Sequence, residues 1–550
     1  MTSSARVRYD VDMIRKHTRV LLRGLFALLA WAGTGARAAA PKVSTGVLAD
    51  GTRWRTAYHV IDSGVDGPAL LVVGGVHGNE PAGARAAGQV RDWPLVKGKL
   101  LVVPRANVPG LAANVRKLSG EAEGRDDLNR NFPSGDASDG PRGEPARAIW
   151  QFIRRQRPDW VLDLHEGFAF HGSHRPGKGK TRSVGSSVIF TKGPALDPIA
   201  RAMQAAANAT VTDPARRFSL LGGGPARGSL VGACTRQLGM RGMILETTYN
   251  HQPISLRTRQ HRAMVSVLMR RLGMIDRDGT DVLARRGGGR IVVGLYDAAG
   301  TGGKGVVRLT GIVDAARDME VHHVGPADLR AAALDAFDVL IFPGGSGSKQ
   351  AAAIGPDGRE AVRAFVRRGG GYLGICAGAF LCSAHYRWSL DLIDTHVFTG
   401  MRQIEGVGRK AMWYRGEGAT VKMQLTDRGK ALFEGIGEHV EVRYHNGPIV
   451  SPKNDPNLAP YTTLAHFRSE QVLYPPQKGT MVDTPAIVSG TYGKGRVISI
   501  SPHPESSPAL HPIFTASLRW LAAARQDRRA SAGWRMCAAT AAQASAGASP

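Results

Sequence analysis

Residues 70–80 read Leu-Leu-Val-Val-Gly-Gly-Val-His-Gly-Asn-Glu, and this stretch decides the fold of the first half of the chain. Its four consecutive apolar residues are typical of a strand that is buried on both faces of a sheet. The two glycines that follow allow a tight turn where the strand ends. His77 and Glu80 lie on this turn. Because α/β active sites gather at the carboxyl ends of strands, the stretch predicts both a strand and a site.

The same alternation of strand and helix continues along the chain. Further short apolar runs occupy residues 100–103, 160–162 and 243–245. Residues 144–157 have the spacing of an amphipathic helix. The alternation predicts an α/β domain with a largely parallel sheet over 41–275. It stops over 276–289, which we interpret as a linker, and begins again over 290–524, so we expect a second α/β domain.

The two ends of the chain differ from its centre. Residues 1–40 contain basic residues, an apolar run and then small residues, which is the order of a cleavable signal peptide. The apolar run has about nine residues, whereas a membrane-spanning helix needs about 20. We therefore expect a periplasmic or secreted protein without a membrane span after cleavage; an uncleaved anchor is the alternative. Residues 525–550 are rich in Ala and Ser, and we expect a disordered tail.

Composition excludes several classes of protein. The chain has 550 residues, 43% of them hydrophobic and 21% charged, so wholesale disorder is excluded. Its net charge of +27 is spread along the chain without a dense basic run interleaved with aromatic residues, and we expect no nucleic-acid partner. The diffuse positive charge suits anionic small substrates or an anionic envelope polymer. Four cysteines are too few for a disulfide scaffold.

Three residues of the first domain form a candidate zinc site. His77 and Glu80 follow one apolar strand, and His165 lies at the end of another. Two histidines and one glutamate, with a fourth position open to water, are the ligand set of a catalytic zinc ion. Glu246 directly follows the run at 243–245 and is the candidate general base. Any single histidine here could belong to the core, but four such residues at strand ends favour a site.

Together with Asp127-Leu-Asn-Arg-Asn-Phe-Pro133, these motifs resemble the M14 zinc carboxypeptidases and the related succinylglutamate desuccinylase/aspartoacylase deacylases. The resemblance covers 41–275 and implies a zinc-carboxypeptidase-like α/β/α fold. It implies a Zn²⁺ cofactor held by His77, Glu80 and His165, and Glu246 as general base and acid. It implies further roles for surrounding residues: Asn129 and Arg130 would bind a free carboxylate of the substrate, Asp127 would fix the tautomer of His77, and Arg116, or else Arg125, would stabilise the oxyanion.

The resemblance implies a zinc metallohydrolase that cleaves an amide beside a free carboxylate. The motif Asn129-Arg-Asn-Phe-Pro133 also suits bacterial enzymes that cut murein peptides, and an exported enzyme meets peptidoglycan rather than cytosolic acyl amino acids. We therefore expect a carboxypeptidase or γ-glutamyl-diaminopimelate amidase acting on peptidoglycan-derived peptides. The alternative is an N-acyl amino acid deacylase, which the short spacing between His77 and His165 favours. The sequence does not indicate an oligomeric state.

The second domain contains a candidate thiol nucleophile. Gly370-Gly-Tyr-Leu-Gly-Ile-Cys-Ala-Gly378 places Cys376 between a strand and an apolar helix. This is the thiol counterpart of the G-x-S-x-G nucleophile elbow. His503 and Glu505 alternate after a later strand and so point the same way. We predict that the three residues meet in one pocket, in which N–H groups of Ala377 and 344–345 form an oxyanion hole.

These residues resemble the triad of class I glutamine amidotransferases. The segment 290–524, including Tyr444-His-Asn-Gly447, is most similar to the amino-terminal domain of biotin-protein ligases. The resemblance implies a flavodoxin-like, class I amidotransferase-like fold. Two interpretations of its activity stay open. Either Cys376 forms a thioester with an amide substrate, or the domain binds a ligand without turnover and is the functional module of a binding protein.

Overall fold

The computed structural model describes residues 41–135, 140–284, 289–411, 414–471, 473 and 479–525. The expected signal peptide and nearly all of the expected tail lie outside these residues. Among the helices described, none combines the length and the apolar character that a membrane crossing requires.

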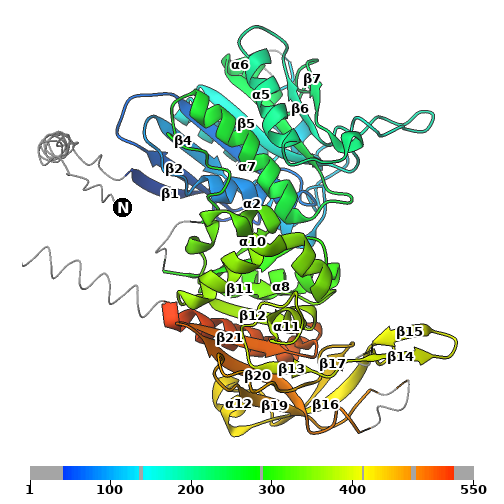
Figure 1. Cartoon of the computed structure of the whole chain (residues 1–550). Coiled ribbons are helices and arrows are strands. Elements are labelled where there is room, and N and C mark those ends of the chain that lie inside the picture. The colour runs from blue at the N-terminus through cyan, green and yellow to red at the C-terminus, as the bar shows by residue number, and fades with distance from the viewer. Residues whose placement is uncertain are drawn as a thin grey trace, which may run out of the picture.

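The chain forms two α/β domains, each built on its own mixed sheet (Figure 1). The first sheet has the strand order β1-β2-β4-β3-β5-β8-β6-β7. The bounds of its strands are β1 Lys42–Leu48, β2 Thr56–Asp62, β3 Ala69–Gly74, β4 Lys99–Val103, β5 Trp160–Gly167, β6 Ser187–Phe190, β7 Ser219–Leu221 and β8 Arg241–Thr248. Strands β4, β3, β5 and β8 are parallel and form the centre of the sheet.

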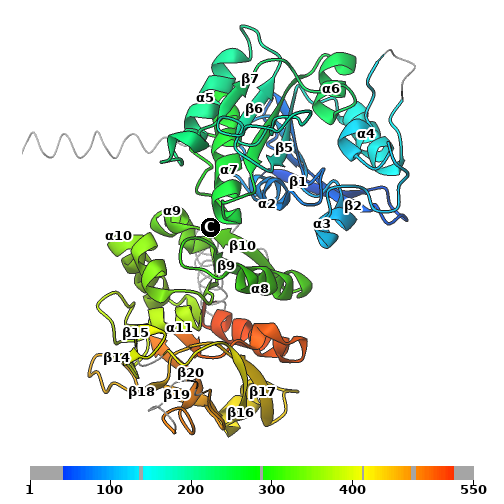
Figure 2. The same cartoon turned by 90° about the vertical axis from the view of Figure 1, so that its right-hand side faces the viewer.

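Helices cover both faces of the first sheet (Figure 2). One face packs against α2 (Pro81–Val90), α5 (Asp197–Asn208) and α7 (Ile254–Arg271). The other packs against α4 (Glu144–Gln156) and α6 (Leu230–Leu238), with the short α3 (Val108–Ala113) nearby. The sheet is therefore the middle layer of an α/β/α sandwich, as the sequence predicted. Its strand order changes direction between β3 and β5, which is where α/β folds bind ligands.

The second sheet has the strand order β10-β9-β11-β12-β21-β20-β19-β16-β17. The bounds of its strands are β9 Ile291–Tyr296, β10 Met319–Val324, β11 Val339–Phe342, β12 Gly371–Ile375, β16 Ala419–Leu425, β17 His439–Tyr444, β19 Thr462–Phe467, β20 Pro485–Tyr492 and β21 Gly495–Ile500. Its first five strands are parallel, in the order 2-1-3-4-5 of a flavodoxin-like fold. Two small ribbons accompany it: β13 (Thr395–Val397) pairs with β18 (Val450–Pro452), and β14 (Met401–Ile404) pairs with β15 (Gly408–Ala411).

The helices of the second domain also lie on both faces of its sheet. α8 (Gly303–Ala315) and the helical residues 511–525 share one core cluster, and α10 (Gly347–Arg367) and α11 (Ala377–Cys382) share the other. Two shorter helices, α9 (Pro326–Arg330) and α12 (Asp427–Leu432), complete the domain.

The sheets are less parallel than the sequence suggested. Strands β1 and β2 pair antiparallel at one edge of the first sheet, and β16, β17, β19 and β20 form an antiparallel extension of the second. The reason is visible in β16, whose residues alternate between buried and exposed. A strand with one solvent-exposed face has no helix packed on that face, and sheets exposed on one face are typically antiparallel.

The two domains are in direct contact through α2 and α7. The indole N–H of Trp93, just after α2, donates to the carbonyl oxygen of Val282, 3.0 Å away. Leu283 and Ala284 are buried in a core cluster of the second domain. The described part of the expected linker is therefore packed between the domains.

Candidate active sites

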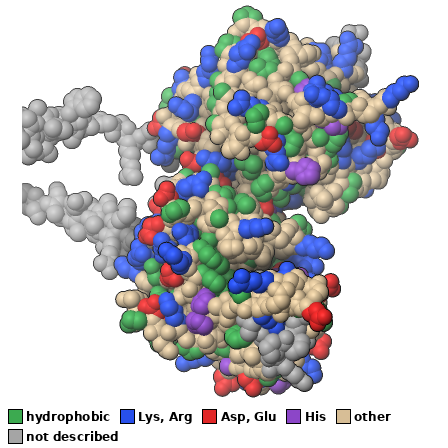
Figure 3. All heavy atoms as spheres, turned by 45° about the vertical axis from the view of Figure 1, so that its right-hand side comes forward, with side chains coloured by type: hydrophobic (Ala, Val, Ile, Leu, Met, Phe, Trp, Pro, Cys, Tyr) green, Lys and Arg blue, Asp and Glu red, His purple; other side chains and the backbone are tan. Residues whose placement is uncertain are grey.

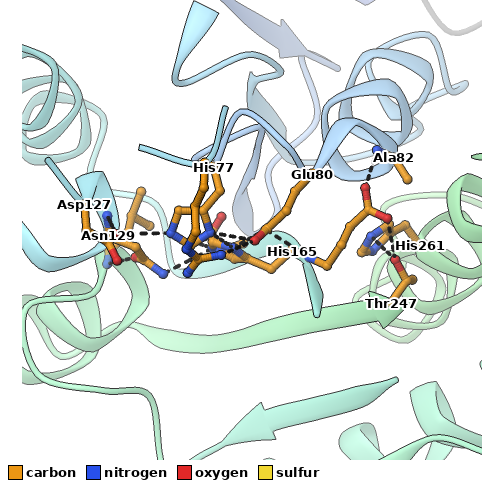
Figure 4. A network of polar contacts seen from close by, with 12 residues as sticks. His77, Glu80, Ala82, Asp127, Asn129, His165, Thr247 and His261 are labelled. Atoms are coloured by element: carbon orange, nitrogen blue, oxygen red, sulfur yellow. Dashed lines mark hydrogen bonds and ion pairs between the residues drawn. The ribbon is translucent and has the colours of Figure 1, made fainter. Parts of the chain in front are cut away.

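His77, Glu80 and His165 form a buried cluster at the carboxyl ends of β3 and β5 (Figure 4). These strands are parallel neighbours, with Val73 opposite Asp163, so their ends meet at one edge of the sheet. Gly75 has φ +67° in the turn after β3, a conformation that favours glycine. One ligand atom of each of the three residues lies within 4.8 Å of the others. The sequence motifs thus converge on one point.

Three polar atoms of the cluster face one another. Nδ1 of His77 lies 2.8 Å from Oε1 of Glu80, and Nδ1 of His165 lies 2.8 Å from Oε2. The two Nδ1 atoms are 3.1 Å apart. All three residues are buried, each at most 3% exposed as a whole residue. Two imidazole nitrogens and a carboxylate converge here, which is a donor set that zinc prefers.

The outward nitrogens of both histidines meet carboxylates. Nε2 of His77 lies 3.1 Å from Oδ1 of Asp127, and Nε2 of His165 lies 2.8 Å from Oδ2 of Asp163. If Nε2 carries the hydrogen in each ring, both Nδ1 atoms present lone pairs to each other at short distance. A cation between them relieves this repulsion. Metal-ligating histidines commonly donate their other N–H to a carboxylate in this way, so the cluster fits a zinc ion.

Glu246 lies beside the cluster on β8. It stands opposite His165 in the parallel pairing of β8 with β5, and it is buried. Burial raises the pKa of Glu246 to about 8, and the negative charge of Glu80 acts in the same direction while His165 opposes it. A divalent cation nearby would lower this pKa again, since it favours the carboxylate. Such a carboxyl can exchange a proton near neutral pH, as a general base and acid must.

Arg116 reaches the cluster from the exposed side. Its Nη1 donates to Oε1 of Glu80 over 2.7 Å, and its side chain is about half exposed. The competing candidate, Arg125, is exposed and contributes its backbone carbonyl oxygen to Asn131. Of the two arginines, Arg116 is therefore the one placed to meet negative charge at the site.

Asn129 and Arg130 occupy different environments. Asn129 is buried, its Nδ2 lies 3.2 Å from Nε2 of His165, and its Oδ1 accepts from the backbone N–H of Leu230. Arg130 is exposed, and its Nη1 donates to the carbonyl oxygen of Asn129 over 2.7 Å. The structure thus places Asn129 beside a candidate ligand and leaves the Arg130 guanidinium at the surface next to it.

Sequence reasoning missed a buried carboxylate, Glu166, that ties the site together. Its Oε1 accepts from the backbone N–H of Ala82, two residues after Glu80, over 2.7 Å. Its Oε2 accepts from the hydroxyl of Thr247, which follows Glu246, and forms an ion pair with Arg257 of α7. One side chain therefore links the segments that carry Glu80, His165 and Glu246. Ala82 and Thr247, which it contacts, are labelled in Figure 4.

Close packing of α2 on β5 supports this arrangement. A Cβ at Gly83 of α2 would lie 2.2 Å from the carbonyl oxygen of Leu164, so only glycine lets the helix approach this closely. The helix begins with Pro81 at its first position, directly after Glu80. The approach brings Glu80 against His165.

The second candidate site surrounds Cys376. This residue lies between β12 and α11 with φ +49°, a strained conformation for a residue other than glycine. Cys376, His503 and Glu505 line one cavity of about 830 Å³. Nδ1 of His503 lies 2.8 Å from Oε1 of Glu505. The Cys376 thiol donates to the carbonyl oxygen of His445 over 3.6 Å, and the neighbouring Cys376 raises the pKa of His503. The structure therefore brings these three residues together in the order thiol, imidazole and carboxylate.

His503 is held in its protonated form by these contacts. Burial lowers its pKa, but the hydrogen bonds and negative charge of Cys376 and Glu505 outweigh burial and raise the pKa to about 10. The other described cysteines, Cys234 and Cys382, are buried and free, and burial raises the pKa of the Cys382 thiol to about 12. Among the described cysteines, Cys376 is the one with a histidine partner.

Two family matches cover these two sites. Residues 66–176 match the succinylglutamate desuccinylase/aspartoacylase catalytic domain, and residues 320–528 match the biotin-protein ligase N-terminal domain. The first match contains His77, Glu80 and His165, and the second contains Cys376, His503 and Glu505. No curated protein matches the chain.

The solved structures to which the chain is similar include three proteins. The mDAP-bound form of Helicobacter pylori Csd4, a D,L-carboxypeptidase, is 24% identical over 38% of this chain and 52% of that one, with a TM-score of 0.32. An aspartoacylase family protein from Mesorhizobium loti is 23% identical over 43% and 69%, with a TM-score of 0.30. The ectoine utilization protein EutE from Ruegeria pomeroyi is 20% identical over 42% and 68%, with a TM-score of 0.29. The chain spans about half the length of the Csd4 structure.

Proposed function

We propose that this chain is a zinc-dependent amide hydrolase whose active centre is the cluster of His77, Glu80 and His165, with Glu246 as general base and acid. The observation that carries the proposal is the convergence of two Nδ1 atoms and a carboxylate beside the buried carboxyl of Glu246. The match of residues 66–176 to a deacylase catalytic domain supports it.

The residues of the chain divide the chemistry among them. Zinc, when bound, supplies a Lewis acid that polarises the scissile carbonyl and lowers the pKa of water. Glu246 takes a proton from the attacking water and delivers it to the leaving nitrogen. Arg116 stabilises negative charge that develops on the carbonyl oxygen. Asp127 and Asp163 hold the two imidazoles in the tautomers that leave Nδ1 free.

The proposed substrates carry a free carboxylate beside the amide. The planar guanidinium of Arg130, exposed at the edge of the cluster, matches the two oxygens of a carboxylate. The signal-like order of residues 1–40 supports export to the periplasm or beyond, where peptidoglycan-derived peptides occur. We therefore propose such peptides as substrates, with N-acyl amino acids as the alternative class.

One assay tests the metal, the base and the substrate class. The zinc-loaded protein is incubated with a panel of murein peptides and N-acyl amino acids, with and without a chelator. We expect chelator-sensitive release of a terminal amino acid from a murein peptide. Glu246→Gln should retain zinc and lose turnover by orders of magnitude. Hydrolysis that survives chelation, or unchanged turnover of Glu246→Gln, would contradict the mechanism; exclusive cleavage of N-acyl amino acids would select the deacylase alternative.

We propose as a second function that Cys376 acts as a nucleophile on an amide. The strained backbone of Cys376, together with the contact chain through His503 to Glu505, favours this over a passive binding pocket. A thiolate needs a neighbouring base and a group that orients the base, and both are present. Alkylation of Cys376 by iodoacetamide at neutral pH should exceed that of free cysteine and fall to that rate in His503→Ala. A rate no higher than that of free cysteine in the wild type would leave only ligand binding.

A further inference from the structure

The Cys376 cavity lies at the carboxyl edge of the second sheet, where the strand order changes direction. Gly302 follows β9, 344–345 follow β11, Cys376 follows β12 and His503 follows β21. In sheets of order 2-1-3-4-5, ligands bind at this edge between the first and third strands. The opening therefore lies where a substrate of this fold enters, and its lining determines which substrate fits.

One wall of the cavity is aromatic. Phe380 lies on α11, and Tyr386 and Trp388 follow it in the chain. The rings of Tyr386 and Trp388 are stacked, with centroids 4.6 Å apart and planes 7° from parallel. Tyr414 also lines the cavity. A flat aromatic surface of this kind favours an apolar or planar portion of a ligand.

The lining of the cavity also contains positively charged residues. Lys304 and Arg308 line it from the first turns of α8, and Arg443 lines it from β17. Gly302, which precedes this 13-residue helix, and its first three residues, 303–305, lie in the lining, which adds the partial positive charge of the helix end. Arg308 donates to the hydroxyl of Ser506 over 2.9 Å, which fixes its guanidinium beside the loop that carries Glu505.

The lining of the Cys376 cavity contains few acidic residues. Among the described residues that line the cavity, Glu505 is the one acidic residue; its Oε1 contacts His503, and its Oε2 is buried without a hydrogen-bond partner. A zwitterionic amino acid such as glutamine carries an ammonium group that needs a carboxylate partner when it is enclosed. The lining offers cations instead, so it favours an anion over a zwitterion.

We propose that the Cys376 cavity takes an anionic amide whose acyl part bears a carboxylate or phosphate and whose other part is apolar or aromatic. This inference rests on the second proposed function and names its substrate class. The Cys376 sulfur bonds the carbonyl carbon, the carbon–nitrogen bond breaks, and the amine leaves with a proton from His503. Water then cleaves the thioester, which returns the thiol and releases the carboxylic acid.

Two alkylating reagents that differ mainly in charge test the anion preference. Iodoacetate is anionic and iodoacetamide is neutral, and both alkylate the same sulfur. The rate at Cys376 of the full chain is followed by mass spectrometry, with free cysteine as reference and Cys376→Ser as the control for other sites. We expect the iodoacetate-to-iodoacetamide ratio at Cys376 to exceed that of free cysteine by about tenfold. The double variant Arg308→Gln/Arg443→Gln should lower this ratio to that of free cysteine; the ratio is read instead of either rate because both reagents react with the same thiolate.

The outcomes separate the inference from the function on which it rests. Rapid iodoacetamide labelling without a preference for iodoacetate would overturn the anion inference and leave the nucleophile intact. Labelling by both reagents at the rates of free cysteine would overturn the nucleophile itself.

Protection of Cys376 tests the aromatic wall. N-succinyl-4-nitroaniline, an anionic amide with a planar ring, should slow iodoacetamide labelling at Cys376 or be cleaved there, and Trp388→Ala should weaken this effect about tenfold. L-Glutamine should protect poorly. Stronger protection by L-glutamine than by N-succinyl-4-nitroaniline, or an unchanged effect in Trp388→Ala, would overturn the proposed substrate class.

Discussion

At the scale of single residues, Asp163 sets the geometry of the candidate zinc site from behind. It lies two residues before His165 on β5, so both side chains point to the same face, and its Oδ2 meets Nε2 of the ring at 2.8 Å. Asp163→Asn should weaken zinc binding about 10- to 100-fold, because the ring loses its orientation and its basicity. Competition with a chromophoric chelator measures this affinity.

The matched control for Asp163 is Asp126→Asn, which removes a carboxylate paired with exposed Lys117 near the same site. It should leave the zinc affinity unchanged. Equal losses in both variants would mean that the surrounding negative charge, and not the hydrogen bond to His165, holds the metal.

Arg130 tests the recognition of a carboxylate. Its guanidinium is exposed and anchored by the carbonyl oxygen of Asn129. Amidation of the substrate's free carboxylate should raise KM sharply in the wild type, because the Arg130 guanidinium loses the carboxylate it pairs with. In Arg130→Ala the guanidinium is already absent, so amidation should raise KM little. Arg125→Ala, an exposed arginine nearby, is the control. Equal sensitivity to amidation in wild type and Arg130→Ala would refute the role.

His503 connects protonation to the thiol site. Its pKa of about 10 arises because the contacts with Cys376 and Glu505 outweigh burial, which acts in the opposite direction. Removal of the carboxylate charge in Glu505→Gln should therefore lower this pKa, so that the ring loses its proton at lower pH than in the wild type. NMR titration of the labelled imidazole carbon measures it. A wild-type titration below pH 7, or no change in Glu505→Gln, would contradict the contact chain.

At the scale of elements, the ion pair between Glu166 and Arg257 connects α7 to the strands of the candidate zinc site. Both side chains are buried, and Glu166 also binds the start of α2 and Thr247 of β8. Arg257→Met should destabilise the protein by about 3–5 kcal/mol, because it leaves the Glu166 charge buried without its partner. Urea unfolding of the zinc-loaded protein measures the loss.

The double variant Arg257→Met/Glu166→Gln distinguishes a charge effect from a packing effect. It removes both charges and keeps an oxygen that can accept from the backbone N–H of Ala82. We expect it to recover most of the stability lost in Arg257→Met. If it is as unstable as the single variant, the packing of Arg257 and not its charge holds the element.

Elements also show how far sequence reasoning reached. Continuous apolar runs identified β3, β4, β5 and β8, because strands buried on both faces need apolar residues throughout. Motifs at their ends located His77, Glu80, His165 and Glu246. The position of Asp163 beside His165 could also have been predicted from the sequence, since alternation along a strand places both residues on the same face.

The remaining features depend on distant contacts. A glutamate inside a buried strand indicates that its carboxylate has a polar partner, but the sequence does not identify that partner. The partner of Glu166 is Arg257, 91 residues away in α7. The antiparallel extension through β16 and β19 was missed for a similar reason. Alternation along β16 predicts that one face of the strand is exposed to solvent, but it does not predict which strand pairs with it.

At the scale of the whole molecule, a buried polar contact joins the two domains. Arg262 of α7 is fully buried, and its Nη2 donates to Oδ1 of Asp328 in α9 over 2.7 Å. Its Nη1 donates to Gln89 of α2 over 2.6 Å. α7 also receives a cap from the second domain, because the backbone N–H of Ile254 donates to Asp297 after β9. The helix that carries Arg257 is thus held from both sides.

The basic residues on the surface are distributed differently from the enclosed pair between the domains. In Figure 3, Lys and Arg side chains are scattered over both domains on the face shown and do not gather into one patch. Within the contact, the pair of Arg262 and Asp328 is enclosed, so water does not screen its charges.

Asp328→Ala should break the contact between the domains as well as the pair. It leaves the Arg262 guanidinium buried with one partner fewer, which costs about 3–5 kcal/mol. Asp314→Ala is the matched control: Asp314 also pairs across the domains, with Arg85, but both side chains are partly exposed, so the loss should stay below about 1 kcal/mol. Calorimetry of the zinc-loaded protein should show one transition in wild type and Asp314→Ala, and two in Asp328→Ala. Two transitions already in the wild type would mean that the domains unfold independently, and the zinc site would then not depend on the second domain for the position of α7.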